Sequence, residues 1–293
     1  MPLSSLVPSQ WLGAVPVALF CCFGGASWAQ GGPDIPAQGA LSHQEKEVPS
    51  SSDFRVSGGV RLWSAKWDSW NVNPTSTGVS VGASRYEVVE SMQGSEKLAA
   101  IPFISARYGA WYLSASTMAK TSYQLRDAAT PLGFDVDSSR AELDVNLGYL
   151  LSPGISISLG NKRIHQLFGQ DEYKWNGPVL GLNANAPLGS GWSLYTSLGL
   201  GRLRGSFPRP DAAGHGSFHT DYRLMEGGLT YAFLSPTDWI RSVVLTAGYR
   251  TQRMSTKGYG LAATPAGGPS IYNTSSDLVD TTQGLVLGLQ GTF

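Results

Sequence analysis

Cysteine is almost missing from this chain of 293 residues. The only two cysteines, Cys21 and Cys22, stand side by side near the amino-terminus. Beyond residue 22 the sequence therefore offers no disulfide, no reactive thiolate and no cysteine-based metal site.

Charge is scarce and balanced. Charged residues make up 14% of the chain, and 21 basic residues offset 21 acidic ones. A basic field that would attract nucleic acid is absent, so we expect no nucleic-acid partner. After the first 25 residues the chain also lacks an apolar run of the roughly 20 residues that a membrane helix needs. Membrane β-strands need only about 9–11 alternating residues, so this class remains open.

The first 29 residues have the pattern of an export signal. Residues 12–25 are apolar, and Ser27 and Ala29 place small side chains before a cut at Gln30. A lipoprotein signal would need a small residue before the modified cysteine, whereas Phe20 precedes Cys21. Residues 30–53 are rich in Pro, Gly, Ser and charge without periodicity, which predicts a flexible leader. We expect residues 54–293 to form one folded domain.

Apolar and polar residues alternate with a period of two along much of this domain. The pattern is clearest where Leu143 and Val145 alternate with Glu142 and Asp144. Such alternation predicts strands with one apolar and one polar face. Ten segments show it: residues 54–67, 98–108, 111–122, 140–149, 155–164, 179–186, 192–203, 222–233, 241–253 and 283–293. In the second of them Pro102 lacks a backbone donor, so we expect a bulge or break there.

The connections between these segments alternate between short and long. Short ones fall near residues 107–110, 151–154, 187–191 and 234–240, and long polar ones near 68–94, 124–137, 166–172, 205–221 and 255–280. This predicts an all-β fold, namely a transmembrane antiparallel up-and-down barrel of about ten strands with both ends on the short-turn side. Aromatic residues cluster beside the short turns, as in an interfacial girdle: Tyr108, Trp111, Tyr149, Trp192, Tyr231, Phe233, Trp239 and Phe293. A soluble β-sandwich with aromatic corners is the alternative.

The carboxy-terminal segment alternates Leu285, Leu287 and Leu289 with small or polar residues and ends on Phe293. It resembles the last strand of Gram-negative outer-membrane β-barrels. The resemblance implies location in the outer membrane, with the leader in the periplasm. It also implies contact with the lipid bilayer, with lipopolysaccharide, and with the outer-membrane assembly machinery through the strand ending at Phe293.

The polar faces of the strands predict a charged lumen. Its expected lining residues are Arg55, Arg61, Arg107, Lys120, Arg140, Lys162 and Arg250, against Glu142, Asp144 and Glu226. Within one antiparallel hairpin, the residue numbers of any two directly opposed residues add up to the same value. This rule pairs Asp144 with Lys162 and Glu226 with Arg250. Two interpretations follow: a packed polar core, favoured because ten strands lie near the filled size range, or a narrow pore with a basic selectivity lining.

The long connections offer candidates for chemistry at the rim. Asp135 and Asp137 form an acidic pair, and His219 lies near Asp221. These four residues resemble the site of the omptins, ten-stranded outer-membrane proteases with an Asp pair opposite an Asp–His pair. The resemblance implies that His219 would take a proton from the attacking water and that Asp221 would orient it. In omptins the Asp precedes the His, whereas here the order is reversed.

Three further patterns of polar and aromatic residues occur in the sequence. His215 and Ser217 resemble the His-x-Ser of outer-membrane lipid A deacylases, with Glu226 as the acid. His215, Ser217 and Asp135 are candidate metal ligands in principle, but the sequence has no EF-hand spacing and no His/Cys ligand set, and we expect neither a metal nor a cofactor. Aromatic residues such as Trp67, Tyr173 and Trp175 fall near the far strand ends and would form an outer belt or an adhesive surface.

The sequence thus favours a non-enzymatic outer-membrane barrel, either a structural or surface protein or a narrow pore. An omptin-like endopeptidase acting at the extracellular rim is the alternative.

Overall fold

The computed structural model describes residues 54–74, 86–127, 135–206, 217–234, 239–259 and 276–293. The expected signal (1–29) and leader (30–53) lie outside the described residues. The strands are β1 (Phe54–Pro74), β2 (Tyr86–Gly94), β3 (Lys97–Tyr108), β4 (Trp111–Asp127), β5 (Asp135–Ser152), β6 (Ile155–Phe168), β7 (Asp171–Gly189), β8 (Trp192–Ser206), β9 (Ser217–Leu234), β10 (Ser242–Tyr259) and β11 (Ser276–Thr292). In the described part of the chain, no helix is long and apolar enough to cross a bilayer.

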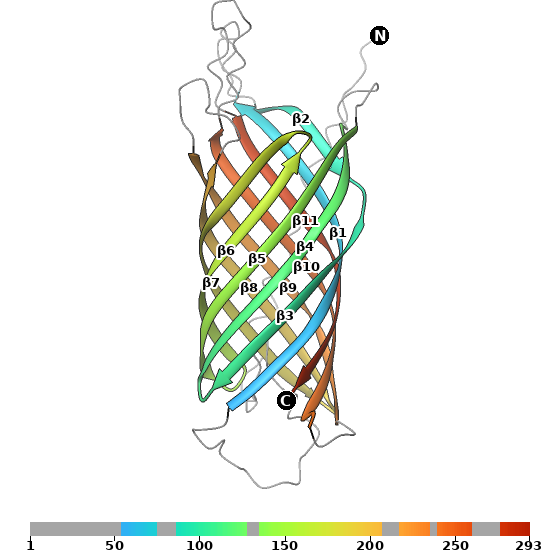
Figure 1. Ribbon diagram of the computed structural model, residues 1–293, viewed down its shortest axis with the longest axis vertical. Helices are drawn as coiled ribbons and strands as arrows, with labels where there is room; N and C mark the ends of the chain where they lie inside the picture. Colours follow the sequence, from blue (N-terminus) through green and yellow to red (C-terminus); the bar gives the residue numbers. More distant parts are fainter. Residues whose placement is uncertain (1–53, 75–85, 128–134, 207–216, 235–238, 260–275) are drawn as a thin grey trace, which may run out of the picture.

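The strands form one closed antiparallel barrel (Figure 1). Each strand from β4 to β11 pairs with its neighbour in sequence, and β11 pairs with β1 to close the ring. The strands β2 and β3 occupy one position in the wall, because both lie between β1 and β4. The wall is therefore ten strands wide, as predicted. The start of β1 and the end of β11 lie at the same end of the barrel (Figure 1).

Alternating residues in the wall separate two environments. On β11 the odd-numbered Leu285, Leu287 and Leu289 are exposed on the outside, while Val286 and Gln290 are buried inside. The same alternation holds on the other strands, where outward Leu, Ile and Val are exposed and the buried inward residues include many Ser, Thr and charged residues. Exposed apolar side chains outside and buried polar ones inside are the reverse of a soluble protein. They match a barrel surrounded by lipid.

Tight turns join the strands at the end where the chain enters and leaves the barrel. Gly154 and Gly191 take φ angles of 105° and 84°, which glycine adopts without the strain of a Cβ atom. The predicted aromatic girdle lies at this end: Trp111 packs on Tyr149, Trp192 on Tyr231, and Trp239 stacks on Phe293.

At the opposite end the strands run further than the sequence pattern indicated. Residues 68–94, expected to be a loop, contain the end of β1 and all of β2, which pair with each other. The strands are up to 21 residues long, about twice the 9–11 residues that a membrane-spanning strand needs. Because strand geometry continues to this rim, the inward and outward alternation also applies to residues that the sequence suggested were loops.

Two irregularities interrupt the wall near β3 and β4. The ladder between β3 and β4 begins only after Pro102, at Phe103, whereas Pro102 itself keeps its place opposite Val60 of β1. A bulge in β4 then falls between Met118 and Thr121. It adds one residue and reverses the alternation. Lys120 lies in this bulge and is exposed, so the structure does not place it in the lumen as expected.

Candidate functional site

A layer of paired charges fills the middle of the barrel interior. Lys162 of β6 donates from Nζ to both oxygens of Asp144 on β5, at 3.0 and 2.9 Å, which confirms the pairing predicted from the hairpin sums. The same ammonium donates to Oε2 of Glu142 at 2.7 Å, and Arg140 donates from Nε to Oε1 of Glu142 at 2.7 Å. Arg140, Glu142 and Lys162 are each no more than 5% exposed. Each of these buried charges lies beside an opposite charge, which offsets the free-energy cost of removing it from water.

The layer reaches across the lumen. The side chain of Gln252 on β10 donates to Oε1 of Glu142 on β5 at 2.8 Å. These two strands are five positions apart in a ring of ten, so they stand on opposite walls. Arg140 adds contacts of 3.4 Å to Thr282 of β11 and 3.5 Å to the sulfur of Met254 on β10. Side chains from facing walls therefore meet at the barrel axis.

Glu226 of β9 forms a second cluster at a similar level. It lies 3.2 Å from Arg250 on β10, which confirms the second predicted pair, and 3.9 Å from Arg61 on β1. The hydroxyl of Tyr195 donates to its other oxygen at 3.1 Å. The guanidinium of Arg250 also lies over the ring of Trp63, 4.9 Å from the centroid. Burial strengthens both contacts because water does not compete for them.

The central layer is balanced in charge. Its described ionisable side chains are four cations, Arg61, Arg140, Lys162 and Arg250, and four carboxylates, Glu142, Asp144, Glu226 and Asp280. The sequence search missed Asp280, which is 2% exposed and accepts a hydrogen bond from Trp67 at 3.3 Å. Arg55 and Arg107, directly opposed on β1 and β3, lie nearer the short-turn end.

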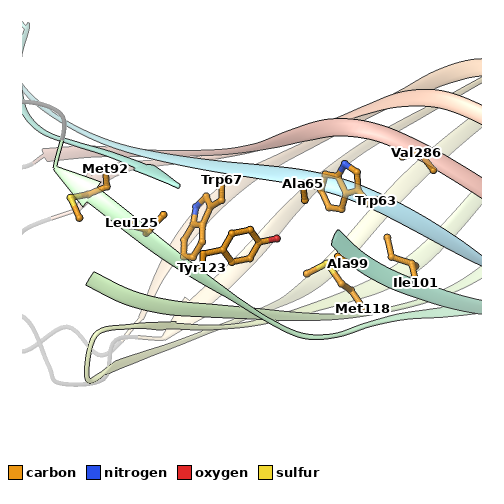
Figure 2. Close-up of a cluster of buried hydrophobic side chains, with 10 residues drawn as sticks. All are labelled: Trp63, Ala65, Trp67, Met92, Ala99, Ile101, Met118, Tyr123, Leu125 and Val286. Carbon is orange, nitrogen blue, oxygen red and sulfur yellow. The ribbon is translucent and has the colours of Figure 1, made fainter. Parts of the chain in front are cut away.

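Two apolar clusters occupy the interior beside this layer. The first consists of Trp63, Ala65, Trp67, Met92, Ala99, Ile101, Met118, Tyr123, Leu125 and Val286, all at most 5% exposed. Figure 2 shows these side chains strung along the inner wall, with Trp67 and Tyr123 close together. The second consists of Ile164, Trp175, Leu203, Tyr222 and Met254. Trp67 and Trp175 are thus interior residues, which contradicts the expectation that they form an outer belt or an adhesive surface.

A polar cavity lies between the charged layer and the short-turn end. Its volume is about 190 Å³, and hydroxyl and amide side chains form much of its lining. Asn183 links this lining together by donating to Ser156 at 3.3 Å and accepting from Ser197 at 2.7 Å. Arg61, Asp144, Glu226 and Arg250 also line the cavity, so it reaches the charged layer.

The structure does not bring the four rim residues of the omptin-like pattern together. Asp135 and Asp137 on β5 and His219 and Asp221 on β9 are all exposed, and they alternate with inward residues on their strands. All four project from the outer surface, on strands separated by β6, β7 and β8. Asp135 instead accepts hydrogen bonds of 2.9 and 3.3 Å from Arg126, which hold the pKa of its carboxyl below the usual value.

The deacylase pattern does not assemble either. His215 lies outside the described residues. Ser217 is exposed at the first position of β9, whereas Glu226 is 3% exposed and lies nine residues further along the same strand, about 30 Å away at strand spacing. Among the residues that the structure describes, no group of three His, Cys, Asp or Glu is placed to hold a metal ion.

Among solved structures, this chain is similar to several bacterial proteins, at low sequence identity. No protein-family model and no curated protein matches the chain. The outer membrane protease OmpT from Escherichia coli is 11% identical, with 83% of this chain and 99% of that chain covered and a TM-score of 0.47. OprG from Pseudomonas aeruginosa is 11% identical over 83% and 96% of the chains with a TM-score of 0.31. The toluene transporter TodX from Pseudomonas putida is 9% identical over 90% and 94%, with a TM-score of 0.28. The chain itself has the fold of a closed antiparallel β-barrel of ten strands.

Proposed function

We propose that this chain is an integral outer-membrane protein of non-enzymatic type, a structural or surface barrel with a lumen that is closed at rest. The exposed band of Leu, Ile and Val around the wall supports the membrane location, because only lipid covers such a band without cost. The aromatic girdle at the short-turn end supports an interface at that level.

The hydrogen bond between Glu142 and Gln252 is the main observation that supports a closed lumen. It joins opposite walls at 2.8 Å, with Arg140 and Lys162 packed beside it. An ion passing this level would have to displace buried side chains that satisfy one another. Open aqueous channels belong to barrels of about 16 strands, and barrels near eight strands are filled by side chains.

Conductance of the refolded protein in a planar bilayer tests this proposal. We expect a silent membrane even when the shift in gel mobility on heating proves that the barrel is folded. Stepwise conductance would contradict the closed lumen. In that case Arg250→Gln, which changes an inward charge, should alter the conductance. The matched change Arg253→Gln, on the outer face of the same strand, should not.

The alternative of an endopeptidase predicts peptide cleavage by the folded protein that is lost in Asp137→Ala and His219→Ala. We expect no cleavage, since these two side chains lie on the outer surface of separate strands.

A further inference from the structure

Small residues at inward positions leave room for the polar cavity beside the charged layer. Gly181 of β7, Gly199 of β8 and Gly288 of β11 line it, and each lies between two exposed leucines of its strand. The cavity volume of about 190 Å³ equals the share of liquid volume of roughly six water molecules. The interior therefore has room for a small polar molecule.

Two of the four charged side chains that line this cavity present their charge to it. The side chains of Arg61 on β1 and Asp144 on β5 are 26% and 23% exposed, whereas those of Arg250 and Glu226 are at most 8% exposed. Arg61 and Asp144 alternate with outward apolar residues of their strands, so their exposed surface faces the lumen. The cavity thus combines an accessible cation with an accessible anion.

Both groups keep hydrogen-bonding capacity for a ligand. Arg61 approaches Glu226 at 3.9 Å, which is longer than a hydrogen bond, and lies over the ring of Phe103 at 5.0 Å from the centroid. These contacts leave N–H donors of its planar fork available to a carboxylate. Asp144 accepts from Lys162 at both oxygens, and each carboxylate oxygen can accept a second hydrogen bond.

The neutral part of the lining suits a hydroxylated molecule. Ser116 of β4 lies directly opposite Asp144, and Asn146 follows Asp144 in the inward row of β5. Hydroxyl groups donate and accept hydrogen bonds, and amides offer both donor and acceptor atoms. A ligand with a polar side chain would therefore find partners on the wall between the two charges.

We propose that this cavity binds a free amino acid with a small polar side chain, whose carboxylate contacts Arg61 and whose ammonium contacts Asp144. A zwitterion brings one charge of each sign to a layer that is already balanced. A simple anion or cation would instead add an uncompensated charge inside the barrel, which is costly. Binding here requires no passage through the charged layer, so it goes beyond the proposed function and is compatible with a closed lumen.

Calorimetric titration of the folded barrel in a nonionic detergent tests the site with three probes of similar size. Free serine carries both charges, glycerate replaces the ammonium by a hydroxyl, and serinamide replaces the carboxylate by an amide. We expect serine to bind at least about tenfold more tightly than either analogue, since each analogue loses one charge-assisted contact. Equal binding of the three probes, or no binding of serine at millimolar concentration, would overturn the proposal.

Two variants of the site and one control complete the test. Arg61→Gln and Asp144→Asn should each weaken serine binding at least about tenfold. The matched control is Lys66→Gln, which removes a cation at an outward position of the same strand as Arg61. It should leave serine binding unchanged, and a loss equal to that in Arg61→Gln would reduce the effect to general charge and contradict the site.

Heat-modifiable gel mobility verifies the folding of every variant. Asp144→Asn also removes a partner of Lys162, so if this variant fails to fold, Arg61→Gln and the three probes on the parent protein still decide. Conductance is a separate measurement. A folded, silent barrel that does not bind serine would refute this site and leave the proposed function intact.

Discussion

Replacing Glu142 by glutamine should lower the free energy of unfolding by about 3–5 kcal/mol, the usual loss when one partner of a buried ion pair is removed. The carboxylate of Glu142 accepts hydrogen bonds from Arg140, Lys162 and Gln252. Its neutral replacement leaves the guanidinium of Arg140 buried at 1% exposure with its closest counter-charge removed. Urea unfolding from lipid vesicles, followed by tryptophan fluorescence, measures the change.

Asp135→Asn is the matched control for this variant. It also neutralises a carboxylate in contact with an arginine, but both partners are exposed. We expect no measurable change, because solvent replaces the lost interaction. Equal stability of the Glu142→Gln and Asp135→Asn proteins would show that the interior is hydrated, and the closed lumen would then be wrong.

The second large effect concerns the outer surface. Leu287→Arg should destabilise the folded barrel by about 2–4 kcal/mol, because it places a cation against the hydrocarbon core. Leu287 is 60% exposed in the isolated chain and lies between Leu285 and Leu289 in the outward row of β11. The free energy of folding into vesicles of defined lipid gives the value.

Leu151→Arg serves as the comparison, since Leu151 is also exposed but lies beside the short turn after β5. An arginine near the interface should cost only about 0–1 kcal/mol. A soluble β-sandwich predicts the opposite pattern, in which neither substitution matters beyond about 0.5 kcal/mol because both side chains already face water.

Much of the wall was predictable, because a strand in a barrel obeys a strict rule. A side chain faces either in or out, and the alternation in residues 283–293 and 140–149 identifies both faces. Hairpin sums then placed Lys162 opposite Asp144 and Arg250 opposite Glu226 without any knowledge of the structure. Both pairs are local, since each joins neighbouring strands around a short turn.

The errors arose where that rule was interrupted or not applied. The bulge before Thr121 reverses the alternation, and nothing in the run of small and polar residues around Lys120 reveals it. On β11 the inward positions have even numbers. Thr282 and Asp280 continue this inward row beyond the segment that the sequence pattern identified. Applying the alternation of β5 to Asp135 and Asp137 would have placed them outside.

Contacts across the barrel could not be derived from the sequence. Gln252 and Glu142 are 110 residues apart and belong to no common hairpin. Their meeting depends on the diameter and tilt that ten strands impose when the ring closes. The closed lumen that we propose is therefore a property of the assembled barrel rather than of any one strand.

Accessibility of single cysteines along β11 tests the whole account most directly. The chain from Gln30 onward has no cysteine, so each of positions 285 to 290 can carry one spin label, whose collisions with lipid-soluble oxygen and a water-soluble nickel chelate are measured. We predict oxygen contact at positions 285, 287 and 289, and protection from both reagents at position 286, which lies opposite Trp63 beside the charged layer. Nickel access at position 286 would reveal an open lumen, and nickel access at the odd positions would contradict the membrane barrel itself.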